Sequence, residues 1–454
     1  MPDKGEMALG QKRRELQEAE DALSRGEPLE AFKQLRAVVD YPGRLEGDRQ
    51  WKDAFHLFAR IATTVTGKEL AEVSERAASN PNDPKALYAL GYQLIENKLH
   101  GFAAAVLSRA DAQTPNQEPI ITELVYALEH LWNNAEACRR LRASGLVESS
   151  WLCRYLLAFH SIMSGDLAEA RRLLPSLLAG AGEHLEMAKR IEGMLGRADA
   201  VHDVTSLDTR DLRGWHFVLN GAILLHISPI GFDEGMFGRY AFTQDSEDRC
   251  LEGIRRLSVA LETMDLHPAR VFIVAERESS ILGHAMAQAL KLPAVAWHHD
   301  GDGEGAPADP GLIVAYDLSN LEGPTLASLS THRPGQILFA HATCWTDDPP
   351  FAADLTTYLH QTNVSPWGKR MRLDPETGSV KHEEPRDEPV EALARAIVSA
   401  RLEDEALPPE DVDALRRLAR AASLVREDGP GAARSAGPRR RQWAGSPVKS
   451  SSFL

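Results

Sequence analysis

The sequence has few cysteines, no long apolar run and no excess of positive charge, and each absence excludes a class of protein. Its four cysteines form no Cys-x-x-Cys pair, which excludes a disulfide scaffold and a cysteine-rich zinc module. No stretch approaches the roughly 20 apolar residues of a membrane-spanning helix. The net charge of −15 argues against nucleic-acid binding, which needs a basic surface. We therefore expect reduced thiols, no membrane insertion and no nucleic-acid partner.

The length and overall composition indicate a globular protein. A chain of 454 residues with 43% hydrophobic residues is large enough for two or three domains with proper cores. The N-terminal residues are highly charged and contain no apolar core of signal-peptide length. We expect a cytoplasmic protein, and nothing in the sequence indicates its oligomeric state.

Residues 84–115 have the pattern of a helical hairpin. Leucines recur at helical spacing, and the small residues Gly91, Ala103 and Ala110 stand where two helices would cross closely. Pro115 ends the unit. This pattern resembles the tetratricopeptide repeat, in which small residues at these three positions alternate with large apolar ones before a terminal proline.

The same small residue recurs along the first part of the chain. Ala31, Ala71, Ala103, Ala137 and Ala170 are separated by 40, 32, 34 and 33 residues. The last three steps match one hairpin per repeat, and the first implies an insertion near residues 42–53. A single hairpin cannot bury its apolar face, so stacked hairpins are expected. We predict a tetratricopeptide-like solenoid domain over residues 1–200, with a helical bundle as the alternative.

The predicted solenoid implies a concave groove for a protein or peptide partner. In such arrays the groove is lined by the first helix of each pair. The candidate partner-binding residues on the best-defined first helix are those expected to point away from its packed face, namely Lys85, Tyr88, Tyr92 and Glu96.

After residue 203 the helical spacing gives way to short apolar runs. Runs of this kind that alternate with amphipathic helices are typical of parallel strands covered by helices. We predict an α/β domain over residues 205–370 with a five-stranded, mostly parallel sheet. The predicted strands begin near residues 221, 270, 294, 312 and 336, and the predicted helices are 247–263, 280–291, 324–330 and 351–361.

Ligands of such sheets bind beyond the carboxyl ends of the strands. The polar residues after the predicted strands are therefore the candidate site residues. The candidate ligand-binding residues are Ser228, Ser279, Ser280, Asp317, Gly323 and Thr325, and the candidate catalytic residues are Asp317 and Glu276.

Two segments of this domain resemble the type I phosphoribosyltransferases. Residues 271–293 are similar to that family's strand, pyrophosphate loop and helix, and residues 312–325 to its phosphoribosyl-diphosphate loop. The resemblance implies that Asp317 holds ribose hydroxyls and that the helix start at Thr325 holds the 5′-phosphate. Tyr316 replaces the first acidic residue of the family's loop, which implies a ligand-binding module that is not catalytic.

Other polar groups can be explained without a catalytic or metal-binding role. His298, His299, Asp300 and Asp302 have the residue types of metal ligands, but a polar loop explains them, so no metal is expected. Cys344 is interpreted as a core cysteine at a strand end. Residues 276–278 are interpreted as a self-paired surface trio.

The C-terminal part is predicted to be a linker with two helices, followed by a tail. Residues 371–390 are charged and contain several prolines, and helical spacing returns at 391–401 and 409–425. The segment 428–454 is rich in Gly, Pro and Ser, which predicts a disordered basic tail.

These patterns favour an intracellular interaction protein, an adaptor or scaffold that binds its partner through the helical repeats, and imply no cofactor. The alternative is a phosphoribosyltransferase-like enzyme that uses Asp317 and Thr325, with magnesium as its cofactor and the repeats as a targeting arm.

Overall fold

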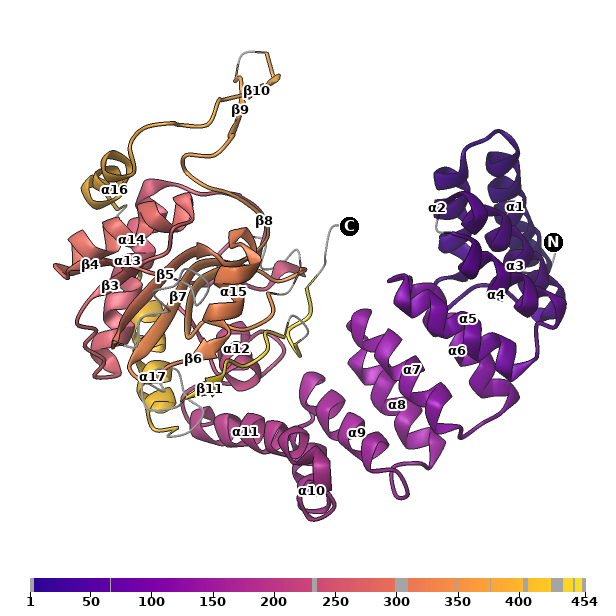
Figure 1. Ribbon diagram of the computed structural model, residues 1–454. Coiled ribbons are helices and arrows are strands. Elements are labelled where there is room, and N and C mark those ends of the chain that lie inside the picture. Colours follow the sequence, from indigo (N-terminus) through magenta and orange to yellow (C-terminus); the bar gives the residue numbers. More distant parts are fainter. Residues whose placement is uncertain are drawn as a thin grey trace. The chain divides into compact units, whose positions relative to one another are not determined.

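The fold is described from a computed structural model (Figure 1). The structure describes residues 4–65, 67–230, 235–298, 309–347, 349–375, 377–402, 407–425, 436–443 and 446–450, with side chains from residue 14 onward. The chain divides into two compact units, Met1–Ile191 and Glu192–Leu454. Among the described residues, no helix combines the length and the apolar character needed to cross a membrane.

The first unit is a series of helical hairpins, which confirms the prediction of consecutive hairpins in the first part of the chain. Each helix packs on the next one along the chain. The hairpins are α1 (Lys4–Ser24) with α2 (Pro28–Val39), α3 (Gly47–Val65) with α4 (Lys68–Ser79), α5 (Pro84–Glu96) with α6 (His100–Gln113), α7 (Glu118–His130) with α8 (Asn134–Ser144), and α9 (Trp151–Met163) with α10 (Leu167–Ala179).

Small residues allow α5 and α6 to cross closely. A Cβ atom on Gly91 would lie 2.6 Å from the Leu107 side chain, which is closer than packed carbon atoms approach. Ala103 and Ala110 are fully buried on α6. The positions that carry the repeat pattern are therefore the positions where the two helices touch.

The first helices of neighbouring hairpins lie next to one another. Helix α1 contacts α3, α5 contacts α7, and α7 contacts α9. Side chains from different hairpins therefore share a surface on α1 and α3, and another on α5, α7 and α9, as the repeat pattern predicts for neighbouring hairpins.

The second unit is an α/β domain. Its helices are α11 (Leu185–Val201, which contains the division between the units), α12 (Leu212–Asn220), α13 (Glu247–Thr263), α14 (Arg277–Leu290), η3 (Leu318–Asn320), α15 (Gly323–Leu329), α16 (Val390–Ser399) and α17 (Pro409–Ser423). Its strands are β1 (Ile223–Leu224), β2 (Tyr240–Gln244), β3 (Val271–Ile273), β4 (Ala294–Ala296), β5 (Gly311–Asp317), β6 (Thr331–His332), β7 (Gln336–Cys344), β8 (Leu355–Val364), β9 (Met371–Leu373), β10 (Val380–His382) and β11 (Gly437–Pro438).

The main sheet is parallel and places a chain reversal at its centre. The strand order is β1-β8-β7-β5-β3-β4, and β2 also pairs with β8. The chain runs from β3 outward to β4 and then returns to the other side of β3 to form β5. The crevice between the carboxyl ends of β3 and β5 is therefore the topological switch point at which such sheets bind ligands.

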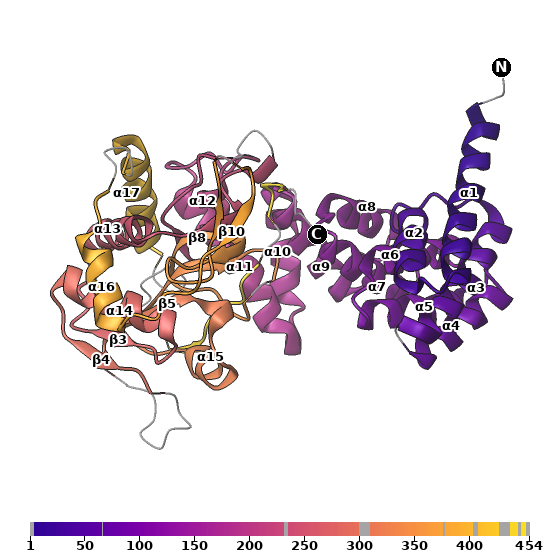
Figure 2. The same cartoon turned by 90° about the horizontal axis from the view of Figure 1, so that it is seen from above.

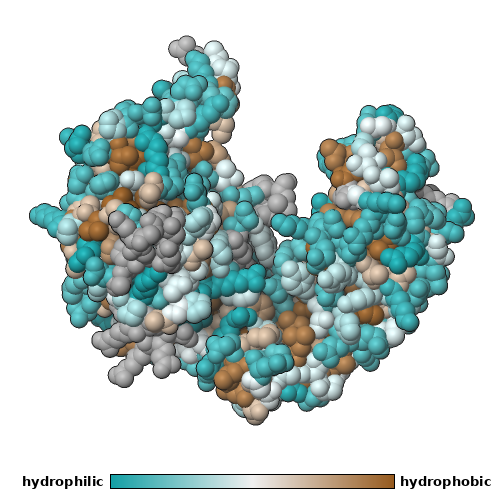
Figure 3. Space-filling model, viewed as in Figure 1, coloured by the Kyte–Doolittle hydropathy of each residue, from teal (hydrophilic) through white to brown (hydrophobic). Residues whose placement is uncertain are grey.

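Helices cover one face of the sheet and an apolar cluster covers the other. Helices α13 and α14 pack on the strands, α16 packs on both of them, and α17 packs on α13 (Figure 2). The opposite face buries Phe272, Ile313 and Leu338 against Trp297 and Leu329, the latter from α15. Outside these cores, hydrophilic residues cover much of the visible surface (Figure 3).

The prediction of five strands is wrong, because the main sheet has seven. The predicted helix at 351–361 is the strand β8, and β2 was missed. The residues Leu355–Val364 include three threonines, a tyrosine and a valine, which favour a pleated, buried surface. Six successive buried residues at the start of β8 leave no exposed helical face.

The prediction of a disordered tail is wrong for residues 436–443 and 446–450. Strand β11 pairs with β6, and Arg439 forms a 2.8 Å ion pair with Asp354 in which its side chain is 3% exposed. Val448 is buried. The segment packs because its few apolar and arginine side chains enter the core of the second unit.

We predict that Gly91→Ala destabilises the protein by about 1–3 kcal/mol, because the added methyl group forces Leu107 out of its place. Denaturant unfolding of the full chain measures the change. The matched control is Gly196→Ala on α11, where a Cβ atom meets nothing within 4 Å and the better helix propensity of alanine should be neutral or stabilising. Equal stability of the Gly91 variant and the wild type would contradict the packing described.

Candidate functional site

The predicted partner-binding residues of α5 lie along an accessible surface. Lys85 and Glu96 are exposed, Tyr88 is half-buried, and Tyr92 is 41% exposed. Helix α7 adds Tyr126, which is 45% exposed. Large aromatic rings that stay this accessible on a folded chain are typical of binding surfaces.

Two acidic groups meet on this surface. Burial and then the charge of Glu96 on α5 raise the pKa of Glu123 on α7, and Glu123 in turn adds to the effect of burial that raises the pKa of Tyr88. The facing carboxylates repel each other, so a cation placed between them would be stabilised.

A histidine pair borders the same surface. The rings of His100 and His130 stack with their centroids 4.2 Å apart, and Tyr126 lies 4.3 Å from His130. Burial, together with His130, lowers the pKa of His100 to about 4. His100 is therefore uncharged at neutral pH, and its ring adds an aromatic group to this end of the surface.

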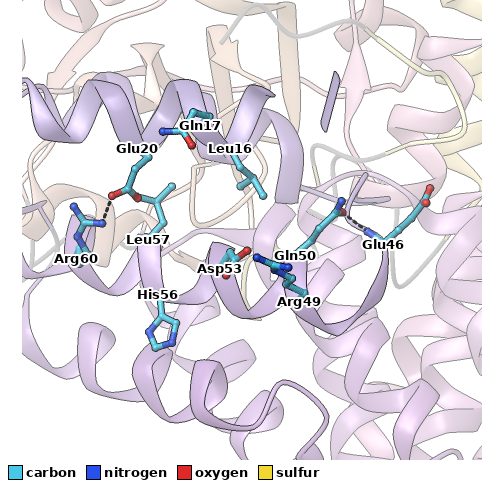
Figure 4. A pocket seen from close by; sticks show the side chains of 10 residues that line it. All are labelled: Leu16, Gln17, Glu20, Glu46, Arg49, Gln50, Asp53, His56, Leu57 and Arg60. Atoms are coloured by element: carbon cyan, nitrogen blue, oxygen red, sulfur yellow. Dashed lines mark hydrogen bonds and ion pairs between the residues drawn. The ribbon is translucent and has the colours of Figure 1, made fainter. Parts of the chain in front are cut away.

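A groove of about 620 Å³ lies between α1 and α3 (Figure 4). Leu16 and Leu57 supply apolar side chains to its lining. Glu20 forms an ion pair with Arg60 across the groove. The remaining lining residues are polar or charged: Gln17, Glu46, Arg49, Gln50, Asp53 and His56. The groove belongs to the surface shared by first helices.

In the second unit, the crevice between β3 and β5 holds three carboxyl groups. The Glu276 carboxylate accepts hydrogen bonds from the backbone N–H groups of Glu278 and Ser279 at 2.8 and 2.7 Å, which caps α14. Glu278 accepts from Ser365 Oγ at 2.5 Å and Asn320 Nδ2 at 2.6 Å. Glu276 and Glu278 are thus used separately, and the predicted self-paired surface trio is wrong.

Burial raises the pKa of Glu278, and Glu276 and Asp317 add to the increase. The hydrogen bond from Asn320 to Glu278 joins the segments that follow β5 and β3, as their position at the switch point requires. The sequence-predicted residues Glu276 and Asp317 therefore belong to one crevice.

Asp317 is paired with a histidine that was not among the predicted site residues. The Asp317 carboxylate lies 2.7 Å from His360 Nε2 on β8, and both side chains are 5% exposed. Its other oxygen accepts from the Ser319 backbone N–H at 2.9 Å. His360 Nδ1 is buried without a hydrogen-bond partner among the described residues. This pair can hold a proton in a dry site, but neither carboxylate oxygen of Asp317 is free to bind ribose hydroxyls.

Of the other predicted ligand residues, Ser279 lies at the same strand ends as Glu276 and Asp317. Ser279 is buried, and its Oγ accepts from the Tyr316 backbone N–H at 3.0 Å. Ser280 is half-buried within α14, Gly323 is exposed and Thr325 is half-buried. No described contact joins Gly323 or Thr325 to Asp317. Of the four residues interpreted as a polar loop, His299, Asp300 and Asp302 lie outside the described residues.

Ser228 lines a separate cavity of about 540 Å³ beside α13. We call it the α13 cavity, and its lining includes His226, Tyr240, Arg249, Glu252, Arg256, Pro408 and Asp411. His226 lies at the carboxyl end of β1, where its Nδ1 is 2.9 Å from Glu252 Oε1 and its Nε2 is 2.8 Å from the Tyr240 hydroxyl. This chain of groups can relay a proton between a carboxylate and a phenol.

Buried ion pairs support the α13 cavity. Asp411 accepts from Arg256 at 2.5 Å and from Arg213 at 2.8 Å. Burial alone would raise the pKa of Asp411, but the two guanidinium groups outweigh it and lower the pKa. The pKa of Glu252 is lowered for a similar reason. Burial alone would raise it, but His226 and Arg256 stabilise the ionised carboxylate and outweigh the effect of burial.

Sequence reasoning missed His226, Glu252 and His360. His226 directly follows an apolar run, so the strand-end rule could have found it. Glu252 carried no comparable signal, because it lies one turn inside a helix. His360 lies within a strand that was interpreted as a helix, which hid its position at the carboxyl end of the sheet.

Comparisons with known proteins add little to this description. No protein-family model matches the chain, and no curated protein is detectably similar. The crystal structure of a thermophilic TPR protein of Thermus thermophilus matches with 18% sequence identity and a TM-score of 0.24. The match covers 40% of this chain and 97% of that one. At this TM-score we base no argument on it.

We predict that Asp411→Asn destabilises the protein by about 3–5 kcal/mol, because it leaves two buried guanidinium groups without a counter-charge. The control, Asp413→Asn on the same helix, removes a carboxylate whose side chain is 60% exposed and should change stability by less than about 0.5 kcal/mol. Chemical unfolding of both variants at neutral pH measures the difference. A similar small effect in both would show that Asp411 does not hold α17 in place.

We predict that Glu278→Gln raises the free energy of unfolding relative to the wild type, by an amount that grows as the pH rises. A carboxyl group whose pKa is raised on folding holds its proton more tightly in the folded state, so stability falls as pH rises from its unfolded pKa through its folded pKa. Glutamine removes this loss. Unfolding free energies of wild type and variant across a pH series test it, with Glu262→Gln, at an exposed position of α13, as the control. A difference between wild type and the Glu278 variant that does not change with pH would contradict the environment described.

Proposed function

We propose that this chain is a protein-binding adaptor whose first unit binds a polypeptide across the surface formed by the first helices of its hairpins. The observation that carries the proposal is the exposure of Tyr92 and Tyr126, at 41% and 45%, on the adjacent helices α5 and α7. Exposed tyrosines give a partner a large apolar contact together with a hydrogen-bonding hydroxyl.

The four predicted contact residues of α5 fit this role. Tyr88, Tyr92 and Glu96 are spaced by four residues, which aligns them along one side of the helix, and Lys85 stands one turn earlier. Such spacing lets an extended or helical segment make several shallow contacts with the surface.

The charge of this surface defines the partner. The charge of Glu96 on α5 adds to the effect of burial that raises the pKa of Glu123 on α7, and the same two helices carry the exposed Tyr92 and Tyr126. A lysine or arginine of the partner would relieve the repulsion between the carboxylates and pack over a tyrosine ring. The proposed ligand is therefore a polypeptide segment with a basic residue next to an apolar one.

The groove between α1 and α3 extends the proposed surface. Its apolar residues Leu16 and Leu57 and its mixed charges suit a second part of the same polypeptide. Binding at two places on one array raises the affinity without requiring a single deep pocket.

We propose that the second unit is a ligand-binding module without catalysis of its own, and that a small polar ligand enters the α13 cavity beside Ser228 and His226. Transfer of a phosphoribosyl group is not favoured by the geometry. The backbone N–H groups of Glu278 and Ser279 at the start of α14, which a pyrophosphate would need, are already bound by the Glu276 carboxylate. That carboxylate would also repel the phosphates.

A selection from a displayed peptide library against the full chain tests the proposal. We expect enriched peptides to contain a basic residue beside an apolar one, and Tyr92→Ala with Tyr126→Ala to weaken binding by at least about tenfold, because truncating aromatic anchors costs about 2 kcal/mol or more. The matched control is Leu29→Ala, which removes a 70% exposed side chain from a second helix, α2.

Two outcomes would contradict the proposal. One is a failure to enrich any peptide. The other is an equal loss of binding in the Leu29 variant and in the tyrosine variants, because the contact would then not be specific to the surface of first helices. Circular dichroism of each variant establishes that the helical unit is intact.

A further inference from the structure

Three side chains of the types that bind metals meet inside the second unit, and none of them lines the α13 cavity. Asp245 follows β2, Cys250 lies in the first turns of α13, and His341 lies in the middle of β7. All three side chains are buried, and one ligand atom from each lies within 4.8 Å of the others.

The distances are those of ligands around a single ion. Asp245 Oδ2 lies 3.0 Å from His341 Nε2 and 3.4 Å from Cys250 Sγ. In a tetrahedral zinc site with bonds of about 2.0 Å to nitrogen or oxygen and about 2.3 Å to sulfur, neighbouring ligand atoms are about 3.3–3.5 Å apart. The two distances to Asp245 are close to these values, and the His341 and Cys250 ligand atoms lie within 4.8 Å of each other, so modest side-chain shifts would bring this set around zinc.

Tyr316 brings a further oxygen to the same carboxylate. The Tyr316 hydroxyl lies 2.8 Å from the same Asp245 oxygen. Donors from Tyr316, His341 and Cys250 thus converge on Oδ2, while Asp245 Oδ1 has no hydrogen-bond partner among the residues that the structure describes and lies 3.9 Å from the Arg249 guanidinium. Buried polar atoms are usually hydrogen-bonded. A buried carboxylate with three donors at one oxygen and none at the other is therefore an unusual arrangement.

The surroundings orient the histidine as a ligand. His341 Nδ1 lies 3.2 Å from Thr357 Oγ1, so a proton on Nδ1 would leave Nε2 free to bind a metal. Helix α13 carries glycine at the closest approach, because a Cβ atom on Gly253 would lie 2.7 Å from His341 Nδ1.

We propose that Asp245, Cys250 and His341 bind one zinc ion, with the Tyr316 hydroxyl as the fourth ligand. Zinc would bind Cys250 as the thiolate, with its proton released to solvent, Asp245 as the carboxylate and His341 as the neutral imidazole. The doubly charged cation and the two anionic ligands sum to zero charge, which suits a fully buried site. One carboxylate, one thiolate and one imidazole are ligands that zinc accepts.

The site would be structural and would form as the domain folds, since its ligands are sealed from solvent. It would join β2, α13, β5 and β7, which are the elements that position the carboxyl end of the sheet. The sequence contains no zinc motif for it, because Asp245 and His341 are 96 residues apart.

Metal analysis of the full chain, purified without a metal-affinity tag, tests the proposal. After refolding with one equivalent of zinc and removal of unbound metal, we expect about one zinc per chain. Cys250→Ala and His341→Gln should reduce this content at least tenfold, while Cys153→Ala, which removes a buried thiol in the other unit, should leave it unchanged. Replacement of zinc by cobalt should give the thiolate charge-transfer band and the visible spectrum of a tetrahedral site.

Zinc-free wild-type protein after this treatment would overturn the proposal. So would zinc that persists in the Cys250 and His341 variants, because the metal would then be bound elsewhere. If either variant fails to fold, the cobalt spectrum of the wild type decides the question, since a spectrum without the thiolate band excludes Cys250 as a ligand.

Discussion

The close approach of paired helices is the constraint on which the first unit depends. A single hairpin leaves an apolar face exposed, so it is stable only when neighbours cover that face. Gly91, Ala103 and Ala110 allow α5 and α6 to meet, and Leu107 fills the space that the missing Cβ of Gly91 leaves. Because apolar residues are used for stacking, other side chains of α5 and α7 stay exposed to solvent, and these include Tyr92 and Tyr126.

In the second unit, the main constraint is the burial of charged side chains. Its parallel strands end in polar side chains, and several of these lie inside the protein and not on its surface. Asp317 is paired with His360, Glu252 with His226 and Arg256, and Asp411 with two arginines. Each pairing offsets the cost of removing a charge from water. The cluster of Asp245, Cys250 and His341 differs from these pairs, because its hydrogen-bond donors gather at one oxygen of the Asp245 carboxylate.

The features that could be predicted from the sequence are the local ones. A hairpin repeat appears within about 34 residues, and the apolar runs of β3, β5 and β7 stand out because buried parallel strands are continuously apolar. Strand β8 was missed because its threonines and polar residues look amphipathic. The pairing of Asp317 with His360 joins residues 43 positions apart, and no local pattern announces such a contact. The packing of residues 436–443 was missed because composition does not show which single side chains enter a core.

Hydrogen exchange of the full chain with and without a selected peptide tests the central claim most directly. The account predicts slower exchange in α5 and α7, and in α1 and α3 for a peptide long enough to reach their groove, because binding covers the first helices. Helices α4 and α6 should exchange at unchanged rates. Protection confined to the second helices, or to the second unit, would contradict the proposal that the first helices form the partner-binding surface.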